Sequence, residues 1–76
     1  MVTPLTYLNP GEQSRVVWIA SADDAKQQLL TRGITEDAVI RYAFRIPLLH
    51  LSAYGVQDSV FFLSRKQARE IFVEKL

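Results

Sequence analysis

Residues 38–46 read AVIRYAFRI and carry the clearest periodicity in the chain. Large apolar side chains at every second position predict an amphipathic strand that has one face in a core. The predicted inner face carries Ile40, Tyr42, Phe44 and Ile46. The other face carries Val39, Arg41, Ala43 and Arg45 and is expected to be a basic outer face. Pro47 follows and ends the strand, because proline cannot donate a hydrogen bond to a central ladder.

Four further stretches are rich in β-branched and aromatic residues and predict strands. They are residues 15–20, 48–56, 59–63 and 71–73. The phase of the second stretch is ambiguous, and Gly55 would permit a bulge that reconciles its two halves. Gln57-Asp58 forms a two-residue hairpin connection to the next strand. Five short strands around one small core predict a mainly β fold, a small barrel with one main helix in a long connection.

The main helix is expected over residues 22–32. Ser21-x-x-Asp24 resembles a capping box at its start. Gly33 suits the left-handed position that ends a helix. The predicted order is therefore one strand, then this helix, then the remaining strands.

Two shorter helical turns are also predicted. Ser64-x-x-Gln67 forms a second capping box, which opens a turn over residues 65–69. Leu5 and Leu8 are three positions apart, so one helical turn would place both side chains on one face. These turns add little regular structure to a chain that is mostly strands.

The composition limits the class of protein. The chain has 76 residues, 49% of them hydrophobic, no cysteine and a net charge of +1. It is long enough for one domain, its hydrophobic content is too high for a disordered chain, and disulfides or cysteine-bound zinc cannot stabilise its thin core. The longest apolar run covers residues 16–20, far short of the ~20 that span a bilayer. The start of the chain lacks the features of a secretory signal, so we expect a cytoplasmic protein.

Five segments in fixed order resemble the ferrous iron transport protein A (FeoA) family. The segments are Leu5-x-x-Leu8-x-Pro10-Gly11-Glu12, Arg15-Val16-Val17-x-Ile19, Leu29-Leu30-x-x-Gly33-Ile34-Thr35, Arg45-x-Pro47-Leu48 and Leu63-x-Arg65-x-x-Ala68-x-x-Ile71-x-Val73-Glu74. The resemblance implies that residues 1–76 form a single SH3-like barrel. It also implies a non-enzymatic accessory protein of ferrous iron uptake, which acts by contact with the cytoplasmic part of FeoB, a membrane iron transporter with a GTP-binding domain.

The resemblance has departures at turn positions. The family's Pro-Leu-Gly-x-Pro loop reads Pro47-Leu48-Leu49-His50-Leu51 here, so a glycine and a proline are absent. Glu36-Asp37 replaces the family's Pro-Gly, and Asp58 stands where the family has a hairpin glycine. The barrel topology tolerates such changes, but they place the conformation of the 47–51 loop and its partner contacts in question. Barrels of this kind also form a domain of some iron-dependent repressors, so the fold alone does not fix the function.

Metal binding and catalysis lack a residue pattern. His50 is the only histidine, and a preformed iron or zinc site needs at least three ligands in fixed geometry. We therefore expect His50 to be an exposed loop residue, and we predict no cofactor and no resident metal. Ser52, Ser59 and Ser64 have no histidine partner pattern, so the sequence predicts no enzyme.

Nucleic-acid binding is the alternative function of a different class. The basic residues Arg41, Arg45, Arg65, Lys66 and Arg69 could form one surface near Tyr54. The acidic residues of the chain nearly balance them, which favours a solvated face and no nucleic-acid partner.

Apolar residues in the 47–51 loop and one phenylalanine predict either a contact surface or packing against the main helix. Tyr42, Phe44, Trp18 and either Phe61 or Phe62 are expected in the core. Adjacent strand residues point to opposite faces, so the other phenylalanine must face outward. The predicted partner-binding residues are Leu48, Leu49, His50 and Phe61. Self-association is a further expectation, because the core is thin and the loops carry exposed apolar residues.

Overall fold

The computed structural model describes all 76 residues as one chain of short elements. The strands are β1 (Val2–Pro4), β2 (Gln13–Ile19), β3 (Val39–Ile46), β4 (Leu51–Val56), β5 (Ser59–Ser64) and β6 (Ile71–Lys75). The helices are α1 (Asp23–Thr31) and α2 (Arg65–Arg69), with single 3₁₀ turns η1 (Leu5–Tyr7) and η2 (Pro47–Leu49). No helix has both the length and the apolar composition needed to cross a membrane.

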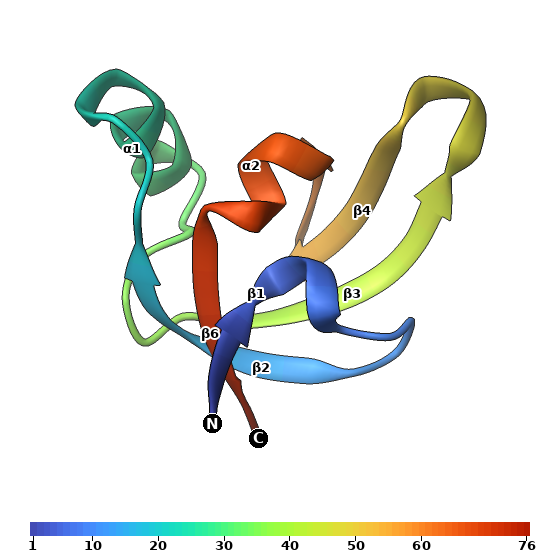
Figure 1. The fold of residues 1–76 in the computed structure, drawn as a ribbon, viewed down its shortest axis with the longest axis horizontal. Coiled ribbons are helices and arrows are strands. Elements are labelled where there is room, and N and C mark those ends of the chain that lie inside the picture. The colour runs from blue at the N-terminus through green and yellow to red at the C-terminus, as the bar shows by residue number, and fades with distance from the viewer.

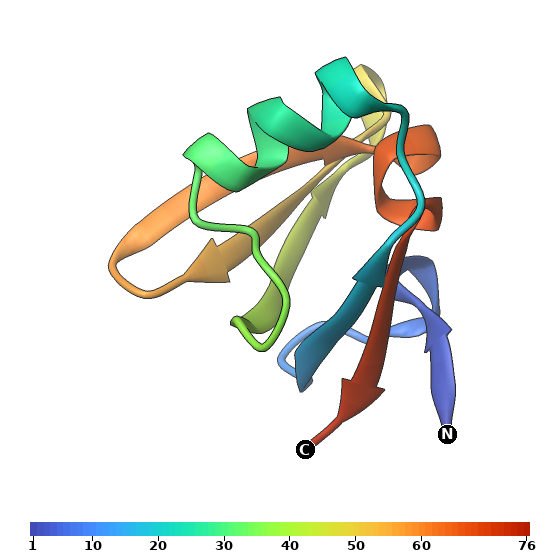
Figure 2. The ribbon, with the colours of Figure 1, turned by 90° about the vertical axis from the view of Figure 1, so that its left-hand side faces the viewer.

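All six strands belong to one antiparallel sheet in the order β1-β6-β2-β3-β4-β5. The sheet is strongly bent, so that the β4–β5 hairpin and the β1–β6–β2 strands form two halves of a small barrel (Figures 1 and 2). Both chain ends lie together, since β1 pairs with β6. This is the mainly β, SH3-like barrel predicted above.

The strand count is six, whereas the sequence predicted five. The additional strand is β1, which pairs with β6 from Val2 opposite Glu74 to Pro4 opposite Phe72. Pro4 does not prevent this pairing, because β1 is an edge strand. The sequence did not predict β1, because its three residues include a proline and are too few to show the alternation of a strand.

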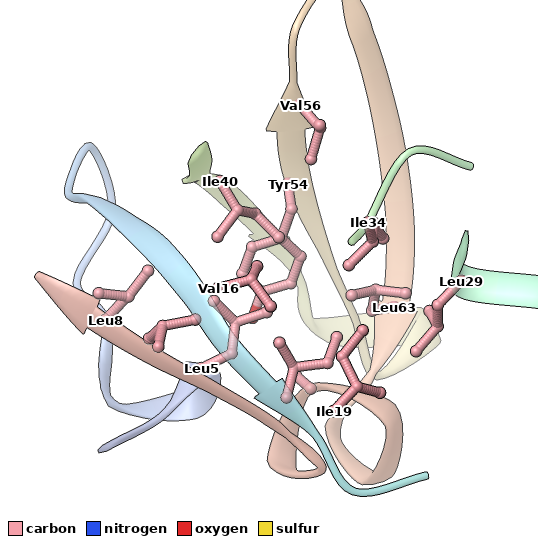
Figure 3. Packing of buried hydrophobic residues seen from close by; sticks show 13 residues of the cluster. Leu5, Leu8, Val16, Ile19, Leu29, Ile34, Ile40, Tyr54, Val56 and Leu63 are labelled. Carbon is pink, nitrogen blue, oxygen red and sulfur yellow. The ribbon is translucent and has the colours of Figure 1, made fainter. Parts of the chain in front are cut away.

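The core is a single cluster of 13 buried residues drawn from both halves of the barrel (Figure 3). Leu5 and Leu8 are both buried within it, which confirms the helical turn predicted from their spacing. Ile40 and Tyr54 come from the central strands, and Leu29 is the buried residue of α1. Half-buried Tyr42 and Phe61 pack against the cluster, as expected of core aromatics.

The second capping box is confirmed and the first is wrong. Ser64 Oγ accepts from the Gln67 amide at 3.2 Å, and the Ser64 amide donates to Gln67 Oε1 at 2.9 Å. At α1 the N-cap is Ala22, which gives no side-chain cap, and Ser21 Oγ instead donates to Glu70 Oε1 at 3.0 Å. The Ser21 hydroxyl, which the local sequence pattern predicted as the cap of α1, is therefore bonded to Glu70, 49 positions away.

The turns behave largely as predicted. Gly33, with φ of 86°, ends α1 in the left-handed region. Gln57 and Asp58 connect β4 to β5, and Gln57 takes a positive φ of 54° in place of a glycine. The predicted 48–56 strand begins later, because Pro47–Leu49 forms η2. Its pairing with β5 is regular from Leu51 to Val56, so no bulge forms at Gly55.

The bulge lies in β3 instead and corrects the predicted faces of that strand. Tyr42 pairs with Tyr54, but Phe44 pairs with Ala53, so Ala43 is an extra residue. A bulge residue reverses the alternation that follows it. Ile40 and Tyr42 therefore face the core as predicted, whereas Phe44 is 50% exposed on the outer side.

A second bulge in β2 has the same effect on Trp18. The pairing with β6 shifts between Val16 and Trp18. Trp18 is 54% exposed and stacks on Phe72, with ring centroids 5.2 Å apart. The expectation that Trp18 belongs to the core is wrong, and Ile19 fills that place.

Candidate functional site

Three of the four predicted contact residues lie in or beside η2. Leu48 is 92% exposed and Leu49 is 62% exposed, so neither packs onto the barrel. His50 is also exposed and caps the turn with φ of 53°, where its amide donates to the Pro47 carbonyl at 3.2 Å. The loop that departs from the family pattern is thus an ordered turn that presents two leucines to solvent.

The fourth predicted residue, Phe61, faces the opposite side. It pairs with Tyr54 in register, is half-buried and packs against the core. Its neighbour Phe62 is the outward residue, 46% exposed. Choosing Phe61 as the exposed member of the pair was therefore wrong, and the outward position belongs to Phe62.

The bulge places Phe44 in the same transverse row as Phe62. Both residues are register partners of Ala53, which lies between them on β4 and is fully buried. A small residue between two phenylalanines lets both rings lie over the outer side of the sheet. The row is therefore an aromatic strip across β3, β4 and β5.

This strip is part of a larger apolar surface. Strand alternation places Ile46, Leu51 and Val60 on the same side of the sheet as the two phenylalanines. We call the outer side of β3–β5, with the two leucines of η2 at its end, the outer apolar face. Its members are Phe44, Ile46, Leu48, Leu49, Leu51, Val60 and Phe62.

The charge beside the outer apolar face is positive. Arg41 lies on the same side of β3, with its guanidinium above Gly55 on β4. The ion pairs in the structure join the N-terminus to Glu74 and Lys75 to Glu12, so Arg41 has no carboxylate partner. The face therefore combines exposed apolar area with one uncompensated cation.

Two stacked tyrosines lie on the inner side of the central strands. Tyr42 and Tyr54 stack with ring centroids 5.2 Å apart, and Tyr54 is only 2% exposed. Burial raises the pKa of Tyr54 above its ordinary value. A buried ring cannot stack on a nucleic-acid base, so Tyr54 does not serve the basic surface considered above.

No group of three or more histidine, cysteine, aspartate or glutamate side chains gathers where it could hold a metal ion. His50 lies in the exposed β3–β4 connection, and the serines considered for catalysis have other positions: Ser64 caps α2 and Ser59 begins β5.

Sequence reasoning missed Phe44, Ile46, Val60 and the choice of Phe62. Large apolar residues stand at positions 40, 42, 44 and 46 without interruption, so the bulge at Ala43 leaves no mark in β3 itself. The available signal lay in β4, where small Ala53 fits between two aromatic rings. Only the pairing register between strands shows which residues lie beside Ala53.

Comparison with known proteins agrees with this architecture. A crystal structure described as an iron uptake regulatory protein (FeoA) is 29% identical, with TM-score 0.87, and the match covers 100% of this chain and 99% of that chain. The solution structure of a FeoA protein from Chlorobium tepidum is 20% identical with TM-score 0.90, covering 97% and 70%.

The same fold occurs inside a larger protein of another kind. A manganese-dependent transcriptional repressor is 21% identical with TM-score 0.88, and the match covers 99% of this chain but 41% of that chain. No curated protein sequence matches the chain. The model of the FeoA domain family matches residues 3–75. The chain therefore belongs to the FeoA domain family, which places it in the context of ferrous iron transport.

Proposed function

We propose that this protein is a non-enzymatic accessory protein of ferrous iron uptake that docks through its outer apolar face onto the cytoplasmic part of a FeoB-type transporter. Membership of the FeoA domain family supports the iron-transport setting. The outer apolar face supports the mode of action, because it offers contact and no catalytic group.

The observation that carries the proposal is a group of seven apolar residues outside a complete core, five of them exposed and two, Ile46 and Leu51, half-buried. The 13-residue core cluster closes without any of them. Leu48 is 92% exposed, so folding buries almost none of its side chain. Contiguous apolar surface of this kind marks an interaction site on a soluble protein. A partner that covers the face would bury its two phenylalanines and the two leucines at its end.

Charge gives the partner surface a second requirement. Arg41 borders the face and has no carboxylate within ion-pairing distance. Exposed arginines at the rim of an interface act mainly on orientation and association rate. We expect the transporter's matching surface to be apolar with a carboxylate opposite Arg41.

A matched pair of variants tests the proposal. Leu49 and Leu76 are 62% and 63% exposed. The β3–β4 connection, which contains Leu49, lies far from the C-terminus, where Leu76 is the last residue (Figure 1). Leu49→Asp should weaken binding to the purified FeoB cytoplasmic domain at least about tenfold, since it places a charge in the interface. Leu76→Asp introduces the same charge on an equally exposed leucine and should leave the affinity unchanged. Calorimetry or surface plasmon resonance measures both.

The strand part of the face needs its own variant. Phe62→Asp should also weaken binding, while circular dichroism shows that the barrel persists. Binding that survives both Leu49→Asp and Phe62→Asp in folded protein would exclude the outer apolar face as the docking site. Light scattering on the same samples reports self-association: a wild-type dimer that Leu49→Asp dissociates would show that the face pairs two copies of this chain and not a transporter.

A further inference from the structure

A small open pocket lies on the side of β3 away from the outer apolar face. Its volume is about 140 Å³, and it is bounded by β3, β4, η1, η2 and α2. Arg45 and Arg65 line it together with His50. These residues come from three different elements and are brought together only by the fold.

Most residues that line the pocket carry a hydrogen-bond donor. Besides Arg45, Arg65 and His50, the lining residues Thr6, Tyr42, Ser52 and Tyr54 each have a hydroxyl, Ala68 has no donor, and no aspartate or glutamate lines the pocket. Tyr54 is 2% exposed, and its burial raises its pKa, so the hydroxyl stays a neutral donor. The exposed arginines stand at the mouth and the buried tyrosine at the floor.

The two arginines carry uncompensated charge. Neither Arg45 nor Arg65 is within ion-pairing distance of a carboxylate. A guanidinium offers paired N–H donors in a planar fork that matches the oxygens of a carboxylate or a phosphate. Two such forks beside a hydroxyl-lined floor have the chemistry of a site for one oxyanion.

The backbone of β3 and η2 builds this arrangement through two irregular features. The bulge at Ala43 turns Arg45 to the inner side, opposite Ser52; uninterrupted alternation would leave Arg45 beside Arg41 on the outer face. His50 holds a left-handed conformation that residues other than glycine seldom adopt. That turn brings the imidazole to the pocket wall.

We propose that this pocket binds a single oxyanion group, a phosphate or a carboxylate, held between Arg45 and Arg65. The pocket has room for one such group, and its donors come from every side. The inference is independent of docking at the outer apolar face, because the two sites lie on opposite sides of β3.

Titration followed by ¹⁵N–¹H NMR tests the inference on the whole protein. Inorganic phosphate, acetate and chloride are added separately at constant pH and ionic strength. Saturable shifts of the amides around His50 and Ser52 with phosphate, absent with chloride, identify a phosphate site; the same response to acetate alone identifies a carboxylate site. Equal or non-saturating responses to all three anions overturn the proposal.

Variants connect the response to the arginines. Arg45→Gln and Arg65→Gln should each raise the dissociation constant about tenfold or more, because each removes a charged hydrogen-bonding group. Arg69→Gln changes an exposed arginine on the same short helix that does not line the pocket, and it should leave the dissociation constant unchanged. Saturable binding that neither pocket variant weakens would also overturn the proposal.

Discussion

The bulge at Ala43 predicts opposite outcomes for two residues that one face of a regular strand would carry together. Ile40, before the bulge, is fully buried in the core cluster. Phe44, after it, is 50% exposed on the outer side. Replacing each by alanine therefore measures whether the alternation is broken between them.

The expected magnitudes are well separated. Truncation of a buried isoleucine to alanine costs about 2–5 kcal/mol, from lost transfer free energy and the cavity left behind. Full burial of a phenylalanine is worth about 1.5–3 kcal/mol, so Phe44→Ala should cost about 1 kcal/mol at half exposure. If β3 alternated regularly, Phe44 would be a core residue and its truncation would cost about 3–5 kcal/mol.

Urea denaturation followed by circular dichroism gives both free energies of unfolding. A chain of this length has a stability of about 4–11 kcal/mol, so Ile40→Ala leaves a marginal fold. Ile40→Val, which costs about 0.5–1.5 kcal/mol, keeps the measurement within range. Phe44→Ala should lower the melting temperature by about 4–8 °C. A loss of 3 kcal/mol or more in Phe44→Ala would refute the bulge, and a loss of less than 1 kcal/mol in Ile40→Ala would refute the core position of Ile40.

Three further predictions concern polar groups. Ser14 Oγ is fully buried without a hydrogen-bond partner in the chain, so Ser14→Ala should leave the free energy of unfolding unchanged or raise it by about 1 kcal/mol, as urea denaturation would show. The Asn9 backbone amide and then Lys75 hold the pKa of Glu12 below its ordinary 4.5. The stability contributed by the Glu12 carboxylate is therefore present above pH 4.5 and is lost as the pH falls through the lowered pKa. Glu12→Gln should make the free energy of unfolding depend less on pH in this acidic range. Burial raises the pKa of Tyr54 above 10.0, so the stability that its neutral hydroxyl contributes is present below pH 10 and is lost as the pH rises through the raised pKa. Ultraviolet titration should show that Tyr54→Phe removes a tyrosine ionisation that occurs above pH 10.

Local patterns predicted the elements well wherever the interactions that form them are local. The Ser64–Gln67 box forms because both partners lie within one turn of α2. Gly33 ends α1 because its left-handed φ is a property of that single position. The spacing of Leu5 and Leu8 likewise sufficed to place a buried turn.

Predictions failed where a distant partner decides the outcome. Ser21 is drawn away from the α1 cap by Glu70, and β1 exists only because β6 offers it an edge. The candidate site was predicted least well. Which of Phe61 and Phe62 faces outward, and whether Phe44 does, depends on the register across three strands. No alternation within one strand contains that information.

The two bulges also explain how so small a barrel can present large aromatic residues to solvent. Thin cores usually need every large apolar side chain, yet here Phe44, Phe62 and Trp18 lie outside a closed cluster. Trp18 is accounted for by its stack on Phe72, which is worth about 0.5–1.5 kcal/mol within the fold. The two phenylalanines have no such aromatic partner and lie on either side of Ala53. Folding therefore accounts for the tryptophan, whereas the phenylalanine row is the surface for which we propose a partner.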